Sequence, residues 1–274
     1  VTEITPKTNY VEVTFTVDPV SVGVYRGDAD LVERGLIGVD WGVGLEVDGS
    51  GTHLLERECG DSPVADSGRT HHSAQWLESL GRTILLVESS PFADDHRDAL
   101  ARYRTRMQEI ADLLVDEDNA RDWEEELLVD DEGNMFTHKA YMVAAGLGMT
   151  ALLSDEPDPR WARRAEELAR RAIGNQRDDG VNPERGGHDV SYQMYGTWLA
   201  QLYHGTLAPG DLKDDLGEAI DRAIAWYDTR VDPVTGQVDI TGSTRVCNAR
   251  DGAEPLETAD AVRVHLTWSL VRDR

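Results

Sequence analysis

The spacing of apolar residues changes at about residue 92 of this 274-residue chain, and this change limits what the chain can fold into. Beyond that point, apolar residues recur at the roughly 3.6-residue period of an amphipathic helix. The spacing predicts six helices, over residues 92–115, 136–153, 160–173, 190–203, 211–227 and 257–271.

Two kinds of helix alternate in this part of the chain. One kind has a single apolar stripe and a charged face, whereas the other is poor in charge all round and should be buried. Each charged helix is followed by a polar loop and then by a charge-poor helix, so an αα-hairpin of about 55–65 residues occurs three times. Equivalent loops of stacked repeats end on the same side. We therefore expect the loops 129–134, 177–188 and 230–256 to meet at one end of the helical layer.

The first 90 residues show the two-residue alternation of half-buried strands. Apolar residues occupy alternate positions over 10–17, 20–24 and 37–47, and 82–88 could form one more strand. The tetrapeptide 48–51 (DGSG) has the composition of a hairpin turn.

The predicted fold class is therefore α+β, in two domains. Residues 1–90 would form an antiparallel β region, sandwich-like or barrel-like and of a size suited to attachment or docking. Residues 91–274 would form an α/α-hairpin domain that resembles part of a toroid.

The formal net charge is −25, from 27 basic and 52 acidic residues, and only three of the basic residues are lysines. Phosphate attraction needs the opposite sign, so we expect no nucleic-acid partner. An acidic surface with almost no lysine suits a protein kept soluble in concentrated salt. The alternative is an ordinary acidic protein from an arginine-rich proteome.

The chain has no run of about 18 apolar residues, so we expect no membrane span. Val1 could follow removal of an initiator Met or cleavage of a leader, and Cys59 and Cys247 could pair or stay free. We favour an extracellular, cell-surface or virion-associated location, in high salt, over a cytoplasmic one.

The densest group of polar residues is the loop 177–188 with the start of the next helix, RDDGVNPERGGHDVSYQ. A helix start needs one capping residue, not this many hydrogen-bonding groups. The glycines let a backbone approach a ligand closely. This stretch is therefore the first candidate for a functional site.

The layout resembles the α/α-toroid of polysaccharide lyases and related glycan-active enzymes, over roughly residues 92–274. The residues that carry the resemblance lie in the second and third loops: Asp179, Gly180, Asn182, Glu184, Gly186, Gly187, His188, Tyr192, Tyr195, Gly196, Asp239, Thr241, Gly242 and Arg245. Three hairpins would give an open arc rather than a closed ring. The resemblance implies an acidic polysaccharide or cell-surface glycan as the ligand.

A lyase that cleaves uronate-containing glycans needs a group that neutralises the sugar carboxylate, a base for the C5 proton and an acid for the leaving oxygen. Asn182 and Arg245 are our candidates for the carboxylate. His188 and Tyr192 stand four residues apart at a helix start, so they are the candidate base and acid, in either order. The alternative is that His188 lies at the helix cap, Asp189 caps it and Tyr192 only packs.

Further residues are candidates for substrate binding. They are Glu184, Asp189, Gln193, Tyr195, Asp239 and Trp226. Hydrolysis would instead need two carboxylates, for which Glu184, Asp189 and Asp239 are the candidates. We predict no cofactor, although a calcium site from Asp178, Asp179, Asp232 or Asp239 is conceivable.

Two functions from different classes fit these observations. The first is a glycan-directed enzyme, most simply a polysaccharide lyase, or a glycoside hydrolase. The second is a non-catalytic surface or virion component of a halophilic system, which binds a glycan or a neighbouring subunit. Either could work as a homo-oligomer or in a larger assembly.

Overall fold

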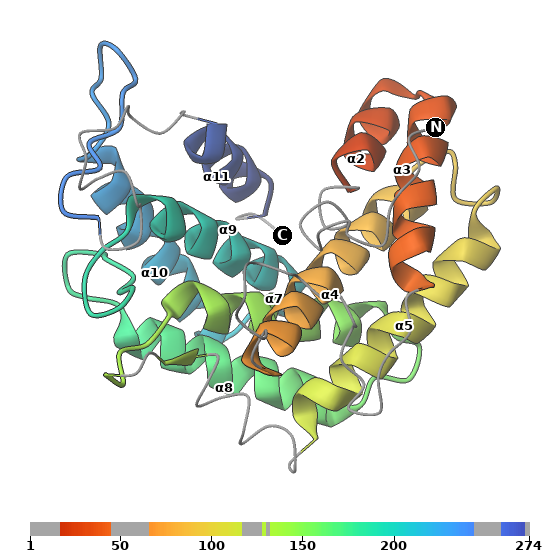
Figure 1. Ribbon diagram of the computed structural model, residues 1–274, viewed down its shortest axis with the longest axis horizontal. Helices are drawn as coiled ribbons and strands as arrows, with labels where there is room; N and C mark the ends of the chain where they lie inside the picture. Colours follow the sequence, from red (N-terminus) through yellow and green to blue (C-terminus); the bar gives the residue numbers. More distant parts are fainter. Residues whose placement is uncertain (1–16, 45–65, 117–127, 130–131, 244–258, 272–274) are drawn as a thin grey trace, which may run out of the picture. The chain divides into compact units, whose positions relative to one another are not determined.

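Helices make up the regular secondary structure of the protein (Figure 1), which is described here by a computed structural model. The described residues, 17–44, 66–116, 128–129, 132–243 and 259–271, contain nine α-helices and no β-strand. The chain divides into two compact units, and the helices α7 (Thr137–Leu153) and α8 (Pro159–Asn175) have residues in both. Unit 1 comprises Val1–Trp123 and Met149–Trp161, and unit 2 comprises Glu124–Gly148 and Ala162–Arg274.

Among the described residues of unit 1, four helices lie wholly within it: α2 (Val17–Arg26), α3 (Ala29–Val43), α4 (Asp66–Glu88) and α5 (Arg97–Val115). α2 packs against α3 and α4, and α5 packs against α3 and α4. The expected domain boundary at residue 90 falls between α4 and α5, and these two helices pack against each other within unit 1.

The predicted α+β fold class is wrong, because the described part of the supposed β region is helical. Residues 20–24 lie in α2, residues 37–43 in α3 and residues 82–88 in α4. Residues 10–16 and 45–51, which carry the rest of the predicted strands and the hairpin turn, lie outside the described residues.

The burial of α3 explains the error. Its apolar residues fit both periods, but the buried ones are Val32, Leu36 and Val39, which have helical spacing, whereas Ile37 is 57% exposed. The helix also has a proper start: the Asp28 side chain accepts a hydrogen bond from the Leu31 N–H at 3.0 Å. Alternation of β-branched residues therefore gave a false strand signal.

Unit 2 contains α9 (Val190–Thr206), α10 (Asp211–Asp228) and α11 (Ala259–Val271), together with most of α7 and α8. α9 packs against both α10 and α11. α7 and α9 run in parallel, because Gly196 lies against His138 near the start of α7 and Gly148 lies against Tyr203 further along. A side chain at Gly148 would come within 2.7 Å of the Tyr203 ring, so glycine lets these two helices approach closely.

The predicted division into buried and charged-face helices is confirmed for α7 and α9. The residues from Ala140 to Ala145 are all buried, and so are those from Gly196 to Gln201. It is wrong for α11, where Leu266 and Leu270 are 60% and 71% exposed.

His204 lies in the core between α9, α10 and α11. It is 4% exposed and its ring stands edge-on to Trp268, with ring centroids 5.0 Å apart. Its Nδ1 has no hydrogen-bond partner within the described part of the chain. The pKa of His204 is lowered to about 4, mainly by burial and in smaller part by the nearby Lys213 ammonium, against opposing effects of Asp214 and Asp221.

No helix in the described residues is both long enough and apolar enough to cross a membrane.

Candidate functional site

Three polar loops of unit 2 contact one another where α7 and α9 begin. The first loop, residues 128–136, approaches the second, residues 176–189, where a Cβ added at Gly186 would lie 3.0 Å from Asn134 Oδ1. Directly after the first loop, the Thr137 hydroxyl at the start of α7 donates to the Pro183 carbonyl at 2.9 Å. The second contacts the third, residues 229–243, where His188 Nε2 lies 3.2 Å from the Thr241 carbonyl oxygen. We call this region the loop end of unit 2. It is the arrangement that stacked αα-hairpins lead one to expect.

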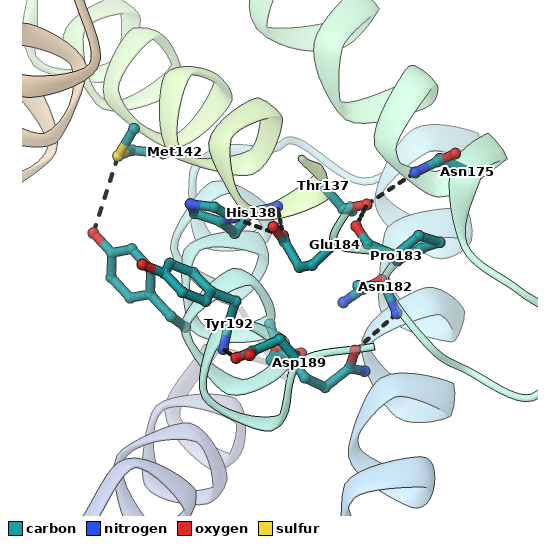
Figure 2. Close-up of polar contacts among 12 residues, drawn as sticks. Thr137, His138, Met142, Asn175, Asn182, Pro183, Glu184, Asp189 and Tyr192 are labelled. Atoms are coloured by element: carbon teal, nitrogen blue, oxygen red, sulfur yellow. Dashed lines mark hydrogen bonds and ion pairs between the residues drawn. The ribbon is translucent and has the colours of Figure 1, made fainter. Parts of the chain in front are cut away.

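A closed histidine–glutamate pair lies at the centre of the loop end (Figure 2). His138 Nδ1 is 2.6 Å from Glu184 Oε1, and the two side chains are 1% and 0% exposed. The same oxygen accepts the His138 backbone N–H at 3.1 Å. A carboxylate oxygen can accept from Nδ1 only if that nitrogen carries a proton, so the contact favours the Nδ1–H form of the ring or the imidazolium.

A tight turn in the second loop aims Glu184 inward. Glu184 and Gly187 exchange two backbone hydrogen bonds of 3.1 Å, and Arg185 and Gly186 between them have φ values of 51° and 72°. Gly186 also has little room, because an added Cβ would lie 3.0 Å from Asn134 Oδ1 in the first loop. The left-handed turn therefore depends on a glycine at this position.

Two tyrosines of α9 cover the buried pair. The Tyr192 ring lies 4.4 Å from the His138 ring, centroid to centroid, and both residues are labelled in Figure 2. The Tyr195 ring lies 6.0 Å from the His138 ring. Tyr195 in turn stacks on Trp198 at 5.9 Å. Tyr192 and Tyr195 are half-buried, whereas His138 and Glu184 are closed from solvent. A ligand at this place would thus meet the tyrosines first.

Two positively charged side chains lie at the ring of Phe136, a neighbour of His138. Lys139 Nζ lies 4.1 Å from the centroid of the Phe136 ring, and the Arg185 guanidinium lies 5.8 Å from it. Phe136 is itself edge-on to His138, at 6.4 Å. Cation–π contacts hold both positive groups at the Phe136 ring, which is next to His138.

The predicted pairing of His188 with Tyr192 is not what the contacts show. Asp189, between them, is the N-cap of α9 and has an extended backbone (φ −138°, ψ 121°), so His188 precedes the helix. Tyr192 contacts His138, whereas His188 lies 5.4 Å from Trp226, centroid to centroid. The four-residue spacing brings side chains together only when both residues are helical.

The two residues predicted to hold a sugar carboxylate have different outcomes. Asn182 is 2% exposed, and its side-chain oxygen accepts from Gln176 Nε2 at 3.2 Å. It therefore packs the inside of the second loop and does not face a ligand. Arg245 lies outside the described residues.

Two of the residues predicted to bind substrate serve the backbone instead. Asp189 is buried and accepts hydrogen bonds from the Tyr192 N–H at 3.0 Å and the Ser243 hydroxyl at 3.2 Å. Gln193 is also buried, and it accepts from the Asn182 N–H at 2.8 Å and donates to the Gly180 carbonyl at 2.9 Å.

The other four predicted binding residues lie in the loop end or beside it. Glu184 is the buried partner of His138, and Tyr195 belongs to the aromatic surface above that pair. Trp226 lies under His188, and exposed Asp239 pairs with Arg230 at 3.2 Å.

The aspartates considered for calcium shape the turns of their own loops. Asp179 accepts from the Val181 N–H at 3.1 Å, and Asp232 accepts from the N–H groups of Val234 and Thr235 at 2.8 Å. These backbone donors lower the pKa of Asp232, and hydrogen bonds from Thr241 likewise lower that of Asp239. Across the described ranges, no three His, Cys, Asp or Glu residues are grouped so that they could hold a metal ion.

His138 and Lys139 are the site residues that the sequence analysis missed. The available signal was their position, because they open the charge-poor helix α7 as Asp189 and Tyr192 open α9. Comparing the first turns of the repeated inner helices would have singled them out.

Comparison with known proteins finds no family model that matches the chain and no curated protein that matches its sequence, so the functional argument rests on the geometry of the loop end.

Proposed function

We propose that the protein acts on an acidic polysaccharide at the loop end of unit 2, most simply as a β-eliminating lyase. The observation that supports the proposal is half-buried Tyr192, whose ring lies against the closed His138–Glu184 pair. A phenol that a ligand can reach, backed by a buried imidazole and carboxylate, is suited to proton transfer.

In β-elimination, a base removes the proton at C5 of a uronate, the bond from C4 to the glycosidic oxygen breaks, and that oxygen takes up a proton. The products are an unsaturated uronate and a new chain end. Tyr192 would accept the C5 proton and donate a proton to the leaving glycosidic oxygen, so that the proton lost at C5 is balanced by the one gained at oxygen. His138, held by Glu184, would position the Tyr192 ring. Lys139 and Arg185 would lower the cost of the negative charge that builds on the uronate carboxylate as the C5 proton leaves.

Elimination suits this site better than hydrolysis does. Hydrolysis needs two carboxyl groups that flank the scissile bond. Glu184 and Asp189 are both closed from solvent and are bound to His138 and to the α9 N-terminus, respectively. Of the predicted carboxylates, only Asp239 is exposed.

The test is incubation of the protein, in molar salt, with uronate-containing polysaccharides, followed by the ultraviolet absorbance of the unsaturated product. The Tyr192→Phe variant should lose activity by about a hundredfold or more, which is the usual contribution of general acid–base catalysis. Tyr25→Phe is the matched control, because Tyr25 is 91% exposed in unit 1. Equal activity of Tyr192→Phe and wild type would remove Tyr192 from the mechanism.

A second candidate is a non-catalytic surface or virion component that binds a glycan or a neighbouring subunit. The closure of His138 and Glu184 favours it, because Tyr192 and Tyr195 can stack on a sugar without proton transfer. This candidate predicts polysaccharide binding without product, or a stable oligomer in molar salt. A strict monomer that binds no polysaccharide would contradict it. An extracellular or cell-surface location in high salt would suit either function.

A further inference from the structure

A second group of residues in the loop end joins the second and third loops. His188 Nε2 lies 3.2 Å from the Thr241 carbonyl oxygen and 3.4 Å from Arg230 Nη2. The Arg230 guanidinium lies over the Trp226 ring, 5.0 Å from its centroid, and Nη1 donates to Asp239 at 3.2 Å. His188 and Arg230 are both partly exposed.

This geometry places two basic side chains next to each other. His188 Nε2 can donate to Thr241 only when it carries a proton, and it can accept from Arg230 only when it does not. Asp239 offsets part of the Arg230 charge, but it is exposed and also accepts the Thr241 N–H at 2.9 Å. An anion bound beside these two groups could accept a hydrogen bond from each.

Both basic groups are held in place before any ligand arrives. Trp226 is buried and supports the guanidinium from below. Gly242 has a φ of 79°, and a Cβ there would lie 3.1 Å from His188 Cε1, so the third loop closes tightly over the imidazole. Groups that are already fixed lose little freedom on binding.

We propose that His188 and Arg230 form a subsite for the carboxylate or sulfate group of a glycan. The inference rests on the proposed function, and it adds a second anion position to the one beside Tyr192. His188 directly precedes the N-cap of α9 and Tyr192 lies in its first turn, so the two positions are neighbours. Acidic polysaccharides carry charged groups at regular intervals, so adjacent sugars of one chain could occupy both.

The experiment follows the His188 Cε1–H resonance by NMR, in protein labelled at its eight histidines, with His188→Gln used for assignment. Glucuronate, glucose and inorganic sulfate are each added at constant ionic strength. Glucuronate should shift the resonance until saturation, and glucose should not. Arg230→Gln should weaken glucuronate binding about tenfold or more, which is typical of a lost charge-assisted hydrogen bond.

The matched control is Arg170→Gln, which removes the same charge from α8, where Arg170 pairs with Glu166 and Asp215. It should bind as wild type does. Asp239→Asn should strengthen glucuronate binding, because it removes a competing acid from Arg230. This second variant keeps the test decisive if Arg230→Gln fails to fold.

The subsite would be overturned if the His188 resonance does not shift with either anion or shifts equally with glucose. It would also be overturned if neither Arg230→Gln nor Asp239→Asn changes glucuronate binding. A response to sulfate alone would assign it to sulfate esters rather than carboxylates. If the subsite exists but the proposed lyase activity does not, the His188 resonance will still shift with glucuronate while no polysaccharide is cleaved.

Discussion

His204 should make the stability of the protein fall steeply in mild acid. Its pKa in the folded state is about 4, against an ordinary value of 6.5, and burial is the main cause. The unfolded chain therefore binds the proton more tightly than the folded protein does. The stabilising effect is complete above about pH 6.5 and is lost progressively as the pH falls towards 4.

The size of the effect follows from the gap between the two pKa values. One pH unit corresponds to about 1.4 kcal/mol, so His204 should cost the folded protein about 2 kcal/mol by pH 5 and about 3 kcal/mol by pH 4. His204 is only 4% exposed, so solvent screens little of this free energy.

The assay is denaturant unfolding in molar salt between pH 7 and pH 4, for wild type and for His204→Phe. The variant has no proton to bind at this position, so its free energy of unfolding should fall by about 3 kcal/mol less than that of wild type. His265→Gln is the control, because it removes an exposed histidine near Asp228 and leaves His204 in place. If the free energy of unfolding falls equally with pH in wild type and in His204→Phe, the reasoning is refuted.

Two further predictions concern the packing around the loop end. Gly180 has a φ of 91°, and a Cβ there would lie 2.2 Å from the Arg222 carbonyl oxygen, so Gly180→Ala should lower the free energy of unfolding by about 2 kcal/mol or more. Gly174→Ala, in α8 with open space around it, should be neutral or slightly stabilising, and equal denaturation midpoints for the two variants would contradict the steric argument. Glu184→Ala should cost about 3–5 kcal/mol, because it leaves His138 buried without the carboxylate. Glu218→Gln on the exposed face of α10 should cost almost nothing in the same unfolding assay, and a similar loss in both would show that the buried pair has no special role.

The helices of residues 92–274 were predictable because one physical signal dominates them. Charged residues on α8 and α10 restrict burial to one stripe. In contrast, α9 has no Asp, Glu, Lys or Arg and α7 has only Lys139, so both helices must lie inside. The predicted and observed bounds of these helices differ by a few residues at most.

The N-terminal helices were not predictable from the same kind of pattern. In α3, alternate residues and residues at helical spacing are both apolar, so periodicity alone cannot choose between strand and helix. The deciding signals are local: Gly27, with a φ of 67°, ends one helix and Asp28 caps the next. These capping signals were available in the sequence and should have outweighed the alternation of valines.

The sequence predicted which loops contribute to the candidate site, but it did not predict which side chains contact one another there. The polar run from Arg177 to Gln193 is indeed part of the loop end, but the partner of Tyr192 comes from another repeat. His138 is separated from Glu184 by 46 positions, and a single sequence does not reveal a contact over that distance. Because the backbone at Asp189 is extended, His188 precedes the helix and does not lie on the helix face where we expected it.

The first turn of α9 is built by two distant parts of the chain. Ser243 Oγ accepts the Val190 N–H at 2.9 Å and donates to Asp189, which itself accepts the Tyr192 N–H. The helix that carries Tyr192 thus cannot fray without releasing the end of the third loop, and the loop cannot detach without exposing the helix start. A ligand that orders one of these segments would thereby order the other. Movement of the third loop would likewise change the orientation of Tyr192.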